Sequence, residues 1–312
     1  MVKWLRQADR PLTATGVLML AVLAAALAGL ALDPRTVTGV PVWLKPAKFA
    51  VSIAIYAFTL AWVFTFLPAW AKTRRLVGRT TAVALVLEMV IIGVQAARGT
   101  TSHFNVATAF DSVLWTTMGV AIVVQTVTSI AVAVALWRQS FADRALGWAL
   151  RLGMTITIAG AFSGGLMAQP TRSQLAGAHA GHRMTVSGAH TVGAPDGGAG
   201  LSGTGWSKEH GDLRVAHFVG LHALQVLPLV VWGLPRRRLD ESTRVRLTVT
   251  AAESYVALFG ILLWQALRGQ SVLAPDVLTM AVLGAWAALT VVAGGMACVK
   301  HACVPTLVPS TR

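Results

Sequence analysis

Two histidines lie within one apolar stretch of the sequence. Residues 211–225 read GDLRVAHFVGLHALQ and contain His217 and His222. Ionisable side chains inside a membrane-spanning helix are costly and by default mark a pathway or a cofactor. A spacing of five residues places the two histidines about 140° apart around a helix, so each addresses a different neighbour. Arg214 shares the side of His217, and Gln225 shares the side of His222.

A second apolar stretch carries polar residues on one face. Glu88 and Gln95 are seven residues apart, close to two helical turns, so both should point into a helix bundle. The run from Arg98 to His103 follows where this stretch ends. It is therefore a second candidate source of polar groups for a site.

Depth along the two stretches can be compared. Glu88 lies ten residues from Arg98, and His222 lies ten residues from Asp212, about 15 Å in both helices. Both side chains are therefore expected near the middle of a bilayer, as potential partners. His103 and His217 would both lie near the outer boundary, where they could form a ligand pair bridging two helices.

Two further groups of charged residues allow two interpretations each. Lys45 and Lys48 bracket a proline at the start of an apolar stretch, where they either snorkel to lipid headgroups, the favoured interpretation, or hold a carboxylate or propionate. Glu253 lies about 21 Å from the outer end of its stretch, in the inner half of the membrane. With Glu88 it could form an inward proton path, or it could hydrogen bond to a neighbouring helix.

A long polar segment, residues 169–212, separates two of the apolar stretches and is rich in Gly and Ser. Its second half holds His190, Asp196 and several turn-forming pairs, followed by the interface anchor Trp206, and predicts a shaped cap. Its first half holds His179 and His182 at a spacing that metals use. The small and polar residues around them favour a flexible tether.

Composition identifies the elements that must position these residues. The chain has 312 residues, 55% hydrophobic and 12% charged, which excludes a water-soluble globular domain and a disordered chain. It should form an all-α, polytopic transmembrane bundle of about eight spans in a single domain, 1–312. The predicted spans are 13–32, 48–69, 80–98, 112–137, 145–168, 213–234, 245–267 and 273–297. The first favours an uncleaved helix over a signal peptide because its apolar run is about 20 residues long.

The distribution of basic residues predicts orientation. Lys and Arg number 26 against 12 Asp and Glu, and seventeen of the basic residues fall in segments that an inside N-terminus makes cytoplasmic. Both termini are therefore predicted to be cytoplasmic, with segment 169–212 outside. The basic excess reflects topology, and no nucleic-acid partner is expected.

The two cysteines exclude a disulfide framework. Cys298 and Cys303 flank His301 at the inner end of the last span, where thiols are normally reduced. Three ligands near a chain end form a weak metal motif, so a packing role at the membrane interface is favoured.

Three sequence segments resemble a group of bacterial integral membrane proteins. They begin at Lys45 (KPAKF), at Gln95 (QAARGTTSHFN) and at Gly211 (GDLRVAHFVGLHALQ). The resemblance covers most of the chain and implies a multi-pass protein of the bacterial cytoplasmic (inner) membrane. No activity is attached to that group, so the chemistry must be argued from the residues.

The first hypothesis is a membrane metalloprotein with a redox or ligand-binding role, holding haem b or a non-haem metal ion in the outer half of the bundle. The candidate ligands are His103, His217, His222 and Glu88. The cations that could pair with haem propionates are Lys45, Lys48, Arg98 and Arg214.

Two alternatives remain open. One is a proton-coupled transporter or channel whose relay uses Glu88, His222 and Glu253, with Gln95 and Gln225 in the polar core. The other is a non-catalytic membrane scaffold or assembly factor, whose outer loop (residues 169–212, including His190, Asp196 and Asp212) meets a periplasmic or membrane partner. Besides such a partner, the lipid bilayer is the expected environment.

Overall fold

The protein is predominantly helical, as expected. The computed structural model describes residues 2–236 and 238–299. Seven of its helices are long and apolar enough to cross a membrane, and one bent pair could be an eighth span. The seven are α2 (Arg10–Leu32), α3 (Leu44–Phe64), α4 (Ala71–Ala97), α5 (Ala109–Arg138), α6 (Arg144–Met167), α10 (Glu241–Leu267) and α11 (Val277–Cys298), and a short α1 (Val2–Ala8) precedes them.

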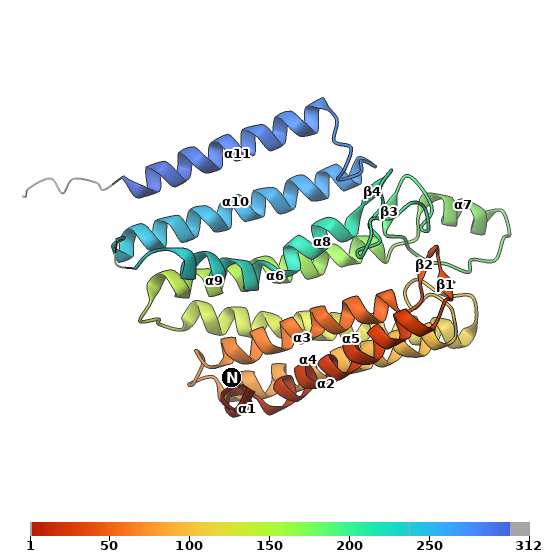
Figure 1. The fold of residues 1–312 in the computed structure, drawn as a ribbon, viewed down its shortest axis with the longest axis horizontal. Helices are drawn as coiled ribbons and strands as arrows, with labels where there is room; N and C mark the ends of the chain where they lie inside the picture. Colours follow the sequence, from red (N-terminus) through yellow and green to blue (C-terminus); the bar gives the residue numbers. More distant parts are fainter. Residues whose placement is uncertain (1, 237, 300–312) are drawn as a thin grey trace, which may run out of the picture.

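The long helices lie side by side along one axis in two groups (Figure 1). Helices α2, α3, α4 and α5 pack on one another, and the α5–α6 contact joins the two groups. In the second group, α6 packs with α8 (Leu213–Leu221), α9 (Ala223–Gly233) and α10. Residues 168–212, here called the cap, lie at one end with the β1 (Thr36–Val37) and β2 (Val40–Pro41) hairpin. The N-terminal helix and the end of α11 lie at the opposite end (Figure 1).

Short polar side chains define where the long helices begin. The side chains of Asp9, Thr108, Asp143, Asp240 and Asp276 each accept a hydrogen bond from a backbone N–H of the first helical turn. Such caps satisfy amide groups that have no partner inside the helix, and an acidic cap also complements the helix dipole. They explain why several helices extend beyond the apolar runs that predicted them.

The predicted span at 213–234 is not one straight helix. It consists of α8 (Leu213–Leu221) and α9 (Ala223–Gly233), bent by 53° at His222. The Thr157 hydroxyl of α6 donates to the Leu221 carbonyl at 3.2 Å and accepts from the Leu224 N–H at 3.1 Å. A side chain inserted into the backbone ladder in this way is a recognised cause of a sharp bend.

The cap contains regular structure in both halves. Its first half, predicted as a tether, includes α7 (Arg172–His179), which begins with a capping box between Thr171 and Gln174. The Gln174 side chain also bonds both backbone groups of Gly188, which links the two halves. In the second half, β3 (Thr191–Val192) pairs with β4 (Gly211–Asp212) directly before α8.

Candidate functional site at the cap end

A histidine and a carboxyl group lie together inside the bundle. His103 belongs to the segment between α4 and α5, and its Nε2 atom lies 3.9 Å from Oε1 of Glu88 on α4. Glu88 is only 7% exposed. The Ser102 hydroxyl lies 3.2 Å from the other ring nitrogen of His103. The predicted partner of Glu88 was His222, but the segment after α4 brings His103 to it instead.

Aromatic rings enclose the His103 ring. The ring centroids of Phe49, Trp115 and Phe104 lie 5.6, 5.5 and 6.1 Å from that of His103. Phe104 adopts a φ of 64°, an unfavourable conformation for a bulky residue, which is sustained only where the surroundings determine it strongly. In this conformation its ring also reaches His190 of the cap, at 4.8 Å.

His190 and Asp196 form a hydrogen-bonded pair in the cap. Nδ1 of His190 lies 2.6 Å from Oδ2 of Asp196, and the same carboxylate accepts the backbone N–H groups of His190 and Thr191. Burial lowers the pKa of His190 despite this partner. Burial by itself raises the pKa of Asp196, but the hydrogen bond from His190 and the backbone N–H donors hold it below its usual range. This pair was predicted only as part of a shaped cap.

Other ionisable side chains lie close enough to His103 to affect its pKa. Burial holds the pKa of His103 well below its usual value, and the charges of Lys45, His190 and His217 lower it further. Lys45 is partly buried, with its ammonium 5.8 Å from the Phe49 ring centroid. Three histidines and a lysine from α3, α8, the cap and the α4–α5 segment therefore share one region.

Two cations attach the cap to the helices. The Lys48 ammonium donates to the Thr204 carbonyl at 2.5 Å. Arg214 donates to the Gly205 carbonyl at 2.7 Å and forms an ion pair with Asp212 at 2.5 Å. Lys48, for which snorkelling to lipid was favoured, therefore bonds to the cap.

The two histidines of α8 and its junction address different neighbours, as their spacing predicts. Nδ1 of His217 lies 2.8 Å from the Gly160 carbonyl and 3.3 Å from the Ser163 hydroxyl on α6. Nδ1 of His222 lies 2.7 Å from the Phe218 carbonyl, one turn back in its own helix. His217 therefore contacts α6, whereas His222 is hydrogen bonded within its own helix.

Gln95 and Arg98 share one carboxylate partner near the start of α5. Gln95 is fully buried and donates to Asp111 at 2.9 Å, and Arg98 contacts the same carboxylate at 2.6 Å. Thr108 also donates to Asp111, close to the start of α5. This network fixes the segment that carries His103, and its centre, Asp111, was not among the residues predicted from the sequence.

Other predicted residues lie elsewhere. Glu253 is exposed on α10, and its side chain forms no hydrogen bond or ion pair with the described residues. Gln225 is partly buried, and its Oε1 atom lacks a hydrogen-bond partner within residues 2–236 and 238–299. Cys298 is exposed at the end of α11, and His301 and Cys303 lie outside the described residues.

The predicted non-haem metal ligands do not form a metal centre in this structure. Across the residues that the structure describes, no three His, Cys, Asp or Glu side chains are grouped closely enough to hold a metal ion. His222 is turned toward Phe218, and among the described residues Glu88 supplies the one carboxyl group within 4 Å of the His103 ring nitrogens. The donors therefore do not fit a three-ligand site.

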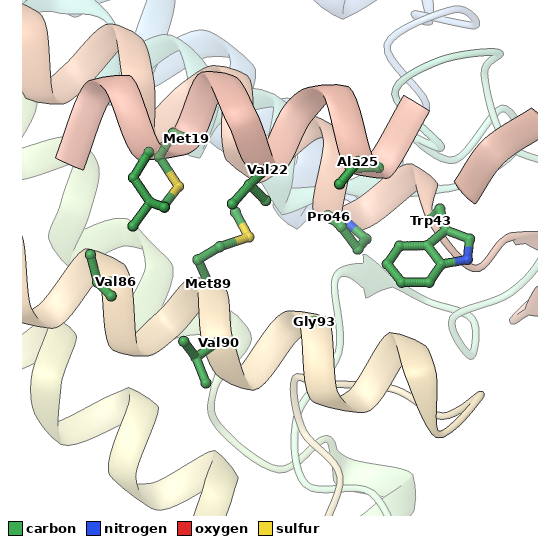
Figure 2. Close-up of a pocket in the computed structure, with 11 residues that line it drawn as sticks. Met19, Val22, Ala25, Trp43, Pro46, Val86, Met89, Val90 and Gly93 are labelled. Carbon is green, nitrogen blue, oxygen red and sulfur yellow. The ribbon is translucent and has the colours of Figure 1, made fainter. Parts of the chain in front are cut away.

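An apolar cavity lies apart from the histidines. It measures about 280 Å³ and is lined by α2, the start of α3 and α4, including Met19, Val22, Pro46 and Met89 (Figure 2). Trp43 closes one end and donates from its indole nitrogen to Asp33 at 2.8 Å. The cavity offers hydrocarbon contacts and no acid–base chemistry.

Proton exchange is the chemistry that the clustered side chains support. Carboxyl and imidazole groups are the usual general acids and bases, and here they extend from the cap to the bundle interior. Comparison of the chain with family models, curated proteins and solved structures finds no match to any of them.

Acidification from about pH 7.5 to about pH 5.5 should destabilise the cap end. The folded-state pKa values of His103 and His190 lie below 6.5, so the unfolded chain binds more protons in this interval. The free energy of unfolding therefore decreases as the pH is lowered. Each histidine can contribute up to about 1.4 kcal/mol per pH unit. The low pKa of Asp196 acts only under more acidic conditions. The measurement is the thermal midpoint against pH, and His190→Gln should show a weaker dependence; an equal dependence would contradict the assignment.

Proposed function

We propose that the protein spans the membrane eight times, with both termini cytoplasmic and the cap outside, and that it couples proton entry at the cap to transport. The support for orientation is the concentration of basic residues at the end opposite the cap. These residues are Lys72, Arg74, Arg75, Arg79, Arg138, Arg144, Arg151, Arg236, Arg238, Arg244 and Arg246. The bacterial inner membrane is the proposed location because the three segments named above resemble bacterial integral membrane proteins.

The observation that carries the proposal is the buried contact between Glu88 and His103, at 3.9 Å. A carboxyl group within a span marks a proton or ion pathway by default. Neutral imidazole can accept a proton on one nitrogen and release one from the other, so His103 is suited to pass protons to and from Glu88. The charge of Lys45, which also acts on His103, adds a cation to this region.

The cap supplies the outer part of the route. His190 and Asp196 form a proton-exchanging pair, and the Phe104 ring lies between His190 and His103. The aromatic enclosure restricts water, so protons would cross between the two histidines only when the cap or Phe104 moves. This arrangement suits gated proton entry better than an open channel.

Proton uptake into proteoliposomes tests the proposal. Vesicles holding a pH-sensitive dye and the purified protein should acidify after an external acid step faster than protein-free vesicles, with potassium and valinomycin clamping the voltage. A solute gradient that accelerates this uptake would identify the coupled substrate. Equal acidification with and without the protein, across the solutes tested, would contradict proton coupling.

A second candidate, haem b, is favoured by the way two imidazoles are held. Nδ1 of His190 is bonded to a carboxylate and Nδ1 of His217 to a backbone carbonyl. Metal-binding histidines usually have such partners, which leave Nε2 as the ligand atom. Lys45, Lys48 and Arg214 could hold the carboxylates of a porphyrin, and the group would supply electron transfer. The chemistry of these donors is what supports a bis-histidine haem as a candidate.

A visible absorption spectrum tests the haem candidate. The protein purified in mild detergent should show a Soret band, with sharpened α and β bands after dithionite, and His217→Ala should remove them. A colourless, folded preparation that stays colourless after incubation with haemin would exclude this candidate. A preparation with neither haem nor proton uptake would instead favour the scaffold hypothesis, with the cap as the partner surface.

A further inference from the structure

An ionisable residue is exposed in the middle of a spanning helix. Glu253 is the thirteenth residue of α10, about 18 Å from its start at Glu241 and about 21 Å from its end at Leu267. Its side chain is exposed and forms no ion pair or hydrogen bond with the described residues. At this depth the surrounding medium is hydrocarbon, in which a carboxyl group without a partner is costly.

The packing of α10 explains why Glu253 faces outward. Tyr255 of α10 donates to the Val219 carbonyl of α8, and Phe259 lies against Gly220. Ser254 contacts α11, through hydrogen bonds to Thr290 and from Trp286. Together with the packing of α10 on α6 and α9, these contacts leave the side that carries Glu253 uncovered by the described residues.

This uncovered side is suited to close contact with another helix. Thr250, Glu253, Ala257 and Gly260 fall within about 80° of one another around α10. Ala257 and Gly260 are exposed, and no atom of residues 2–236 or 238–299 lies within 4 Å of a Cβ placed on Gly260. Small residues let two membrane helices approach closely, and Thr and Glu side chains can hydrogen bond across the contact.

We propose that this side of α10 is the contact between two copies of the chain in the membrane. A two-fold axis along the membrane normal places each residue at the same depth in both copies. The two Glu253 carboxyl groups would then meet and share one proton, so that one carboxyl donates to the other and a single negative charge remains. The Thr250 hydroxyl of each copy supplies a further donor.

Self-association explains the composition of the surface. The four residues include a carboxyl group and a hydroxyl but no cation, so a symmetric contact satisfies them without a basic partner. A different membrane protein with a basic residue at mid-depth is the competing occupant. In that case the purified protein would be a monomer.

Disulfide trapping in membranes tests the contact. Gly260→Cys in a Cys298→Ser, Cys303→Ser background should form cross-linked dimers on mild oxidation, because a disulfide requires Cβ atoms about 4 Å apart. Val90→Cys is the control, since Val90 is 55% exposed on α4 and, like Gly260, lies seven residues before its helix ends. The Gly260→Cys dimer should exceed the control by about tenfold. Equal cross-linking of the two variants would overturn the proposal.

Substitution of the carboxyl group tests its role separately. Glu253→Gln keeps hydrogen-bonding groups and should preserve the Gly260→Cys cross-link, whereas Glu253→Leu should reduce it about tenfold. Light scattering in nanodiscs should give the mass of a dimer for the unmodified chain. A monomer would overturn the proposal whether or not Glu253→Leu folds.

Discussion

Glu88→Gln is expected to lower protein-dependent proton uptake by about 100-fold, the usual scale for loss of a positioned acid–base group. Glutamine has nearly the shape of glutamate but cannot take up a proton at physiological pH. It can occupy the same place beside His103, so the segment after α4 should keep its position. The effect would therefore report on proton transfer, and the initial rate of dye acidification in proteoliposomes measures it.

The matched control is Glu209→Gln, which removes the same charge from an exposed position in the cap. Its uptake rate should equal that of the unmodified protein. His103→Gln, which removes the neighbouring imidazole, should reduce uptake to a similar extent as Glu88→Gln. Uptake by Glu88→Gln at the level of the control would show that protons do not pass through this carboxyl group.

Helix content was predictable because hydropathy is a local property. Each run of about 20 apolar residues must satisfy its own backbone hydrogen bonds in a bilayer, so length and composition suffice. The predicted runs overlap all seven long helices, although the number of membrane crossings depends on how α8 and α9 are counted. That bend depends on Thr157 of another helix, so periodicity within residues 213–234 could not predict it.

The composition of the candidate site was harder to predict than its location. The sequence placed His103 and His217 near the outer boundary, and the spacing of Glu88 and Gln95 predicted one polar face on α4. In the structure, His103 and His217 do share one region. The approach of His190 to Phe104 and His103 depends on the φ of Phe104 and on how the cap folds. Both depend on contacts between distant segments, so the local sequence does not predict them. Glu253 shows the limit of the rule that ionisable residues face inward, since α8 and α11 contact other sides of its helix.

The close contact of α6 with α8 makes Gly160→Ala the stability variant with the largest expected effect. A Cβ on Gly160 would lie 2.4 Å from the Gly220 carbonyl carbon and 2.6 Å from the Leu221 nitrogen. Both are backbone atoms, so the helices must move apart, and overpacking of this kind costs about 1–3 kcal/mol. The shift would also displace the Gly160 carbonyl from Nδ1 of His217.

Gly165→Ala on the same helix separates this contact from a general effect of alanine. No atom lies within 4 Å of a Cβ placed on Gly165, so only the higher helix propensity of alanine applies, a gain of up to about 1 kcal/mol. In detergent, the thermal midpoint should fall for Gly160→Ala and stay level or rise for Gly165→Ala. The α6–α8 backbone contact sets the distance between the two helices and so the position of His217. Equal midpoints for the two variants would mean that this contact is absent, and the position of His217 would lose its support.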